Sequence, residues 1–382
     1  MTTLYLENGR LFTPQGLQPN PGLVIRDGRI AAIGAPCPEG AERLDARDLL
    51  VAPGFIDTHI HGGKQADTMD GTPEALREIA RHLAEHGVTS WLPTTVACAP
   101  EALDRILTAV EQVRQEGTDG AEVLGAHLES NFLASKYKGA QPPEYLRPIG
   151  DPELGAVLAK HAGTIRLMTL APELEGAEDF VRDLVARGVV VSVGHTDATY
   201  DQVMNAVDAG STRVTHLCNA QRGFHHREPG VLGAGLVSDR LYTEIIADLE
   251  HVHPAGLTIA YRCKGPERLM LVSDAVRGSG LEPGRYELGG HPTVIDGKVA
   301  RLENGTIAGS VITLERAVRN MVQAAGVPLE SALRMASDAP ARSLGLSNKG
   351  RIEAGLDADL VLLTDALDVR VTVVSGRIVY RT

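Results

Sequence analysis

Short apolar runs alternate with longer helix-periodic segments from about residue 51 to residue 346. Eight runs have the continuous hydrophobicity of buried parallel strands, and they cover residues 55–59, 90–94, 123–129, 166–170, 189–195, 213–216, 243–248 and 269–274. Helical periodicity fills most of the intervals, at residues 73–85, 100–115, 153–160, 178–187 and 200–209. Eight β/α units over roughly 290 residues predict a closed (β/α)8 TIM-type barrel. A doubly wound open sheet is the alternative, but no GxGxxG motif follows the first run.

The two ends of the chain have a different pattern. Residues 4–6, 23–26 and 30–33 form short apolar runs, with an Asp27-Gly28 turn between the last two. Residues 360–363, 369–374 and 378–380 repeat this texture around Ser375-Gly376. An isolated hairpin is only marginally stable, so we expect the ends to pair. The sequence therefore predicts a small sheet domain of residues 1–52 with 347–382, and a barrel of residues 53–346.

Ionisable residues stand where the apolar runs end. The runs close at His59 with His61, Glu129, His195, His216, Asp248 and Asp274. The carboxyl ends of barrel strands converge on one face, where such enzymes keep their active sites. A polar strand end is unremarkable for any one of these residues, but packing does not explain so many in succession.

These residue types suit a catalytic divalent metal. His59 and His61 lie two apart, so both imidazoles leave an extended strand on the same side. Glu129, His195 and His216 add one carboxylate and two imidazoles, which leaves a coordination position open for water. Zn²⁺ fits this donor set best, and Fe²⁺, Mn²⁺ and Co²⁺ accept the same donors. Asp274 is a candidate for proton transfer beside such a water, with an N-cap role as the alternative.

Composition removes other classes of function. The net charge of −12 and the single Trp91 among 4% aromatic residues argue against a nucleic-acid partner, which needs a basic or stacking surface. The four scattered cysteines form no CxxC pair, which favours free thiols in a reducing compartment. Neither a secretory signal nor an apolar run long enough to span a membrane is present, so we expect a soluble, cytoplasmic protein with no membrane partner.

Longer motifs resemble a known family. The segments PGFIDTHIHGG at 53–63 and KGRIEAGLDADLVLL at 349–363 resemble the amidohydrolase superfamily. Within it, the chain is similar to the N-acetylglucosamine-6-phosphate deacetylase family, through HLES at 127–130, KGA at 138–140, VGHTDA at 193–198, THLCNAQ at 215–221, REPG at 227–230, ADLEHVHP at 247–254, VSDAV at 272–276 and GTIAGS at 305–310. These motifs run in order over nearly the whole chain.

The resemblance implies a barrel with a small β-sandwich made by both termini, in a homodimer whose subunits complete each other's sites. It implies one or two divalent metals per subunit, held by Glu129, His195 and His216 and, for the second, by His59 and His61. Asp274 matches the catalytic acid and base. The sugar-phosphate positions are Asn219, Ala220, Arg227 and His251, the last two supplied across the dimer, and the positions for the sugar and acetyl end are Ala140, Ile307, Ala308 and Gly309.

One position departs from the family pattern. Gln141 replaces a histidine that polarises the acetamide carbonyl in many members, and a neutral amide donates a hydrogen bond but supplies no positive charge. Ser130-Asn131 also replaces the Gly-Pro that usually follows the metal-binding glutamate. We expect Gln141 to assist the oxyanion.

The expected reaction is metal-dependent hydrolysis of N-acetyl-D-glucosamine 6-phosphate to D-glucosamine 6-phosphate and acetate. A metal-activated water attacks the acetamide, and Asp274 takes its proton and passes it to the amine. The alternatives are an amidohydrolase for another N-acyl amino sugar or a cyclic amide, and a barrel that senses a sugar phosphate without turnover. His82 and His86, four apart in a helix, are expected at the surface rather than as ligands.

Overall fold

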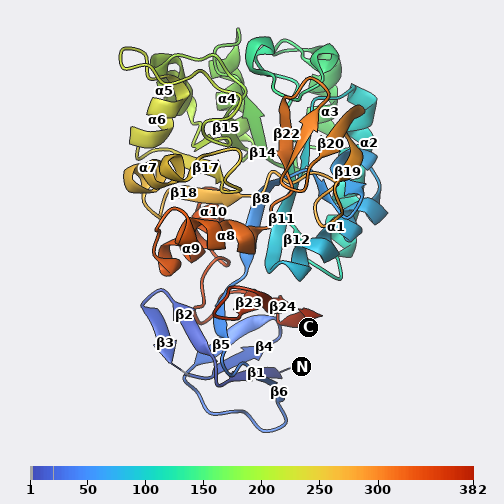
Figure 1. The fold of residues 1–382 in the computed structure, drawn as a ribbon. Coiled ribbons are helices and arrows are strands. Elements are labelled where there is room, and N and C mark those ends of the chain that lie inside the picture. The colour runs from blue at the N-terminus through green and yellow to red at the C-terminus, as the bar shows by residue number, and fades with distance from the viewer. Residues whose placement is uncertain (1–2, 20) are drawn as a thin grey trace.

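The computed structural model describes residues 3–19 and 21–382 (Figure 1). Residues 1, 2 and 20 lie outside the described residues, so the predicted domain division is untested there. Among the described helices, none combines the length and the apolar character that crossing a bilayer requires.

A parallel barrel forms the larger body of the described chain. Its eight strands are β8 (Phe55–Ile60), β11 (Val88–Thr95), β13 (Ala126–Glu129), β14 (Ile165–Leu170), β15 (Val190–Val193), β16 (Arg213–Val214), β17 (Tyr242–Ile246) and β18 (Leu269–Val272). Each strand pairs in parallel with the next. The ring is closed between its last and first strands, where the Asp274 N–H donates to the His59 carbonyl at 2.8 Å. The predicted TIM-type barrel is confirmed.

The third predicted strand is interrupted. A short strand β12 (Glu122–Val123) pairs with the edge of β11 that faces away from β8. The next strand, β13, begins only at Ala126. Gly125 between them has φ 145°, a conformation that L side chains rarely adopt. The prediction of one continuous strand over residues 123–129 was therefore wrong, because the strand is interrupted at Leu124 and Gly125.

Helices follow the strands and cover the barrel. They are α1 (Pro73–Glu85), α2 (Pro100–Glu116), α3 (Pro152–Lys160), α4 (Ala177–Ala186), α5 (Tyr200–Ala209), α6 (Gly230–Val237), α7 (Pro254–Lys264), α8 (Leu314–Gln323), α9 (Leu329–Ala336) and α10 (Asp338–Ser343), with 3₁₀ turns η1 (Thr68–Asp70), η2 (Ser135–Tyr137) and η3 (Pro143–Tyr145). Thr72 caps α1 by accepting from the Ala75 N–H, and a proline opens the first turn, where its missing N–H costs no hydrogen bond. The five predicted helices agree with the structure to within three residues.

The two end segments of the described chain form adjoining sheets below the barrel (Figure 1). One sheet has the order β5-β4-β1-β6, and the other has β25-β24-β23-β7-β2-β3. Their strands are β1 (Thr3–Glu7), β2 (Arg10–Thr13), β3 (Gly16–Pro19), β4 (Leu23–Arg26), β5 (Arg29–Ile33), β6 (Glu42–Asp45), β7 (Leu50–Pro53), β23 (Leu360–Leu363), β24 (Val369–Val374) and β25 (Arg377–Arg381). Leu6, Ile25, Leu362 and Val373 share one apolar core, so the expected pairing of the termini is confirmed.

An antiparallel sheet that the sequence analysis did not predict follows β18. It consists of β19 (Gly284–Leu288), β20 (His291–Ile295), β21 (Val299–Leu302) and β22 (Ile307–Ser310). The sheet has a small core of its own, which includes Leu288, Ile295 and Ala308 and joins the barrel at Val96 and Val276. Two further short strands, β9 (Gly62–Gly63) and β10 (Ala66–Asp67), form a hairpin after β8.

Candidate metal centre

Three of the predicted metal-binding and catalytic residues lie at sharp turns of the backbone. His195, His216 and Asp274 have φ values of 48°, 26° and 48°, in the left-handed region that non-glycine residues seldom occupy. Each residue lies two positions after the end of a barrel strand. The turns keep these side chains at the mouth of the barrel instead of continuing the strand, which is the kind of local strain that functional sites hold.

The carboxylate of Glu129 is the centre of the first group. Its Oε1 lies 2.8 Å from His195 Nε2 and 3.0 Å from His216 Nε2, and the two nitrogens are 3.1 Å apart. All three side chains are buried. One carboxylate and two imidazoles therefore face a common point, as the sequence predicts.

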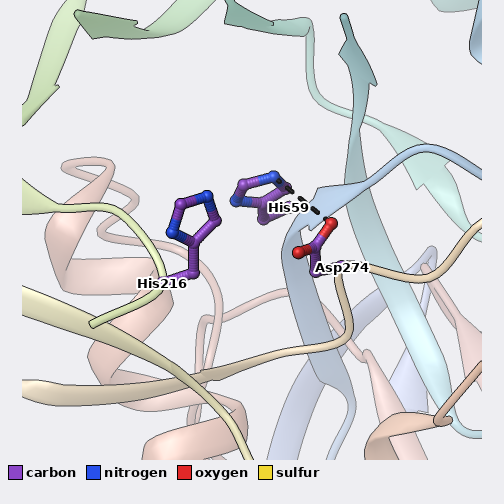
Figure 2. A group of neighbouring side chains, drawn as sticks. All are labelled: His59, His216 and Asp274. Atoms are coloured by element: carbon purple, nitrogen blue, oxygen red, sulfur yellow. Dashed lines mark ion pairs between the residues drawn. The ribbon is translucent and has the colours of Figure 1, made fainter. Parts of the chain in front are cut away.

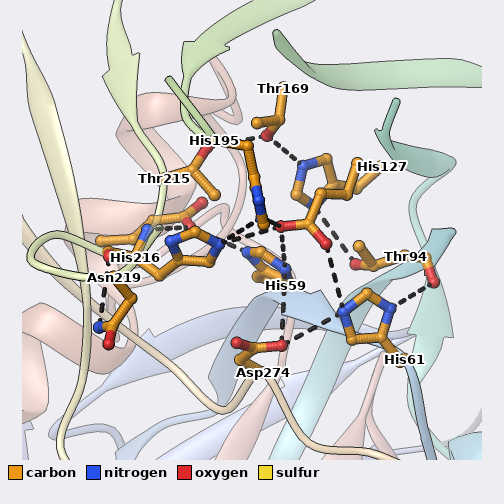
Figure 3. A network of polar contacts seen from close by, with 12 residues as sticks. His59, His61, Thr94, His127, Thr169, His195, Thr215, His216, Asn219 and Asp274 are labelled. Carbon is orange, nitrogen blue, oxygen red and sulfur yellow. Dashed lines mark hydrogen bonds and ion pairs between the residues drawn. The ribbon is translucent and has the colours of Figure 1, made fainter. Parts of the chain in front are cut away.

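His59 and His61 form a second group on the other side of Glu129. His61 Nε2 lies 3.2 Å from Asp274 Oδ1 and 3.6 Å from Glu129 Oε2. His59 Nε2 lies 3.5 Å from Glu129 Oε1 and 3.7 Å from Asp274 Oδ1. Figure 2 shows the rings of His59 and His216 beside the Asp274 carboxylate, and Figure 3 shows how the two groups join.

The outer nitrogens of three rings fix which nitrogen faces inward. His195 Nδ1 donates to the Tyr137 carbonyl at 3.0 Å, and His61 Nδ1 donates to the Thr94 carbonyl at 3.1 Å. His59 Nδ1 lies 3.1 Å from Glu244 Oε2. Because these oxygens only accept, each Nδ1 carries a hydrogen, and in the neutral form of each ring Nε2 presents its lone pair to the centre.

This arrangement fits a divalent cation. Inward lone pairs and the Glu129 and Asp274 carboxylates converge, and the buried His59 Nε2 has no hydrogen-bond partner among the described residues. Ligand histidines in metalloproteins are held in the same way, by an acceptor on the nitrogen away from the metal. Three overlapping clusters each have ligand atoms within 4.8 Å of one another: Glu129, His195 and His216; Glu129, His59 and His61; and His59, His216 and Asp274.

The electrostatics of the site also favour positive charge. Burial by itself lowers the pKa of His59, but the carboxylates of Asp274, Glu129 and Glu244 outweigh burial and raise that pKa to about 10. Burial opposes ionisation of Glu129, yet His195 and His59 hold its pKa well below the usual value. His127, packed edge-on against His59 at 4.7 Å between ring centres, has its pKa lowered by burial and by His59. The buried carboxylates therefore favour positive charge at this point, which a bound divalent metal would supply.

A buried ion pair that the sequence analysis missed holds two residues of the site in position. Glu244 and Arg213 are both fully buried and pair with each other, and Arg213 also donates to Thr58 Oγ1 at 2.7 Å. Glu244 Oε2 accepts from the His216 backbone N–H at 3.2 Å as well as from His59. The sequence did contain a signal for this pair, because each of two short apolar strands includes an ionisable residue. Burying an unpaired charge costs a large free energy, so the two residues are expected to pair.

A cavity of about 300 Å³ opens beside the cluster. The predicted substrate positions that line it are Ala140, Gln141, Asn219, Ala220, His251, Ile307, Ala308 and Gly309. Val96, Leu288 and Thr306 also line it and were not predicted. The β19–β22 sheet therefore forms one wall of the cavity.

Gln141 is fixed by two contacts. Its Oε1 accepts from the Ala97 N–H at 2.7 Å, and its Nε2 donates to Glu129 Oε2. The first contact fixes the orientation of the amide, because only the amide oxygen can accept from the Ala97 N–H. The NH₂ group therefore faces the Glu129 carboxylate. The structure thus gives Gln141 a role in holding Glu129 that the sequence analysis did not foresee.

Two predicted phosphate residues behave differently from each other. His251 lines the cavity of its own chain, with its Nδ1 held by Asp248 Oδ2 at 2.6 Å, which differs from the expectation that a second subunit supplies it. Arg227 is exposed, contacts His226 Nε2 at 2.8 Å and does not line the cavity. The single chain therefore brings together every predicted site residue except Arg227.

A parallel barrel with a carboxylate–histidine cluster at the carboxyl ends of its strands is the architecture of a metal-dependent hydrolase. The model of the amidohydrolase family matches residues 50–379, and the chain belongs to that family.

Among its relatives, the N-acetylgalactosamine-6-phosphate deacetylase of Escherichia coli O157:H7 is 41% identical over 377 residues, which cover 98% of this chain and 99% of that protein. The N-acetylglucosamine-6-phosphate deacetylase of Vibrio furnissii is 39% identical, over 94% of this chain and 90% of that protein. The Mycobacterium smegmatis N-acetyl-D-glucosamine-6-phosphate deacetylase, solved as an Asp-to-Ala mutant with N-acetyl-D-glucosamine-6-phosphate, is 37% identical with a TM-score of 0.91, over 100% of this chain and 99% of that one.

Proposed function

We propose that this chain hydrolyses the acetamide of N-acetyl-D-glucosamine 6-phosphate to D-glucosamine 6-phosphate and acetate. The observation that carries the proposal is the convergence of Glu129, His195, His216 and Asp274 beside a cavity of about 300 Å³. Relatives of matching length are named deacetylases of 6-phosphorylated N-acetyl amino sugars, which supports this substrate class.

Glu129, His195 and His216 would hold one divalent metal, and His59 and His61, with Glu129, would hold a second. Zn²⁺ suits these nitrogen and oxygen donors, and Fe²⁺, Mn²⁺ and Co²⁺ accept the same set. When bound, such a metal lowers the pKa of a water molecule and polarises a carbonyl. The protein keeps the donors in place through Tyr137, Thr94 and Glu244.

Asp274 is the residue we assign to proton transfer. Its carboxylate is at the cavity wall, and its backbone is tied to β8 through the His59 carbonyl and to β22 through the Ser310 N–H at 2.8 Å. It accepts the proton of the attacking water and then gives it to the departing amine, which is a poor leaving group without that proton.

The sugar phosphate would be recognised by groups that line the cavity away from the metal cluster. Asn219 offers a side-chain amide, Gly309 and its neighbours offer backbone groups, and His251 offers a ring nitrogen beyond the one that Asp248 holds. We propose that Arg227 of a second chain completes the phosphate site, in a homodimer. Its exposed guanidinium matches the geometry of a phosphate.

The C4 epimer of the substrate is the second candidate, because the relative in Escherichia coli O157:H7 is named for N-acetylgalactosamine 6-phosphate. We also propose a cytoplasmic location, since all four cysteines are free.

Acetate release tests the function directly. The substrates are N-acetylglucosamine 6-phosphate, N-acetylgalactosamine 6-phosphate and N-acetylglucosamine without phosphate, on protein whose metals have been counted by elemental analysis. We expect metal-dependent release that requires the phosphate and is fastest with the glucosamine derivative. Faster release from the galactosamine derivative would favour the second candidate, and no release from either phosphosugar by folded, metal-replete protein would refute both.

A further inference from the structure

A separate group of potential metal ligands lies at the C-terminal end of α1, away from the barrel mouth. His82, Glu85 and His86 are spaced i, i+3 and i+4, which puts them on one face of the helix. One ligand atom from each lies within 4.8 Å of the other two. His82 was expected at the surface, but its residue is 2% exposed because Gly63 and Gly280 leave room for its ring against the backbone.

The hydrogen bonds of His82 leave one nitrogen unsatisfied. Its Nε2 lies 3.4 Å from Ser279 Oγ, whose own hydrogen goes to the Val311 carbonyl at 3.3 Å, so Nε2 is the donor. Nδ1 therefore carries a lone pair, and this buried atom has no hydrogen-bond partner among the described residues. It faces the Glu85 carboxylate, with 3.8 Å between His82 Nδ1 and Glu85 Oε2. Two electron-pair donors thus oppose each other with no hydrogen between them.

His86 is prepared in a similar way. Its Nδ1 lies 3.0 Å from Oε1 of Glu315 on α8, and Thr313 donates to the same oxygen at 2.7 Å. A carboxylate that accepts from one ring nitrogen leaves the other nitrogen as the ligand, as in carboxylate–histidine–zinc sites.

We propose that His82, Glu85 and His86 form a separate divalent-metal site of the Zn²⁺ type. Ligands around one tetrahedral Zn²⁺ stand about 3.4 Å apart, so Glu85 and His86, whose side chains are 42% and 28% exposed, rotate inward to meet the ion. Water takes the remaining position. Lys64 Nζ, now 3.8 Å from Glu85 Oε2 on a side chain that is 37% exposed, turns to solvent when the cation replaces its charge.

The site would stabilise the walls of the neighbouring catalytic centre. His82 packs against Gly63, which follows the HxH segment, and against Gly280, which follows Asp274. Glu315 ties the same cluster to α8. A metal held by α1 would therefore stiffen both loops without contacting substrate.

Zinc counting on matched variants tests the proposal. The wild type, Glu85→Gln, His86→Asn and the control Glu78→Gln, a residue of the same helix whose side chain is 45% exposed, are dialysed against Zn²⁺ and analysed for bound metal. We expect the wild type and Glu78→Gln to hold one more zinc per chain than the other two variants, with all four folded by circular dichroism. A zinc-edge anomalous map of wild-type crystals then has a peak next to His82 Nδ1.

Equal zinc in all four chains, together with no anomalous peak at His82, would overturn the site. Neither measurement depends on acetate release, so failure of the proposed hydrolysis would leave this result readable.

Discussion

Replacing Glu244 by glutamine removes one charge from the fully buried pair beneath the metal centre. Arg213 keeps its own charge, because a guanidinium does not deprotonate in proteins. Breaking a buried ion pair in this way costs roughly 3–5 kcal/mol in the free energy of unfolding. The variant also loses the carboxylate that orients His59, and loss of such a partner weakens metal binding by about 10–100-fold.

The assay is urea unfolding of wild type, Glu244→Gln and the control Glu178→Gln, with metal content measured on each. Glu178 forms a surface pair with Arg182, so its substitution costs about 0–1 kcal/mol. A second variant, Glu244→Gln with Arg213→Met, removes the uncompensated charge and should recover part of the lost stability but none of the lost metal affinity. A stability loss for Glu244→Gln no larger than that of the control, with unchanged metal affinity, would refute the reasoning.

Three further predictions concern single side chains. Asp274→Asn should lower the rate of acetate release by about 10²–10⁴-fold while bound metal, measured by elemental analysis, is largely retained; a rate near wild type would reassign the proton transfer. Gln141→Leu, which leaves Glu129 Oε2 without its amide donor, should weaken metal binding by about 10-fold in chelator competition, and unchanged affinity would count against that contact. Burial lowers the pKa of Lys264 from 10.5 to about 8, so between these values the unfolded chain binds more protons and stability contributed by this residue rises with pH. Urea unfolding at about pH 7.5 and about pH 10 should therefore show wild type gaining on Lys264→Met at the higher pH, and a constant difference would contradict the lowered pKa.

Most of the barrel could be predicted from the sequence, because most of its strands are apolar runs that end in a polar residue. Glu129, His195, His216 and Asp274 could be found from this pattern alone, since parallel strands bring their carboxyl ends to one face. The left-handed turns at three of them were not predictable, because no glycine marks those positions.

Other parts depend on tertiary contacts. Glu244 lies inside β17, which the hydrophobicity of the sequence predicts as a buried strand. The same pattern does not identify Arg213 as the partner of Glu244. The β19–β22 sheet did have local signals, since Asp296-Gly297 and Asn304-Gly305 are typical hairpin dipeptides between alternating residues. They were missed because an antiparallel insertion does not belong to the β/α repeat. The placement of His251 beside the cavity of its own chain depends on its contact with Asp248, which the sequence does not specify.

The β19–β22 sheet separates recognition of the sugar from the chemistry of the reaction. Its core is built largely from its own residues, with Leu288, Ile295 and Ala308 among them, whereas the candidate metal ligands lie at or just after the carboxyl ends of the barrel strands. Thr306, Ile307 and Gly309 reach the cavity from this sheet. Drift or recombination in this segment can therefore change which sugar is accepted while the reaction chemistry is inherited unchanged, which makes the sheet a natural unit for exchange between paralogues.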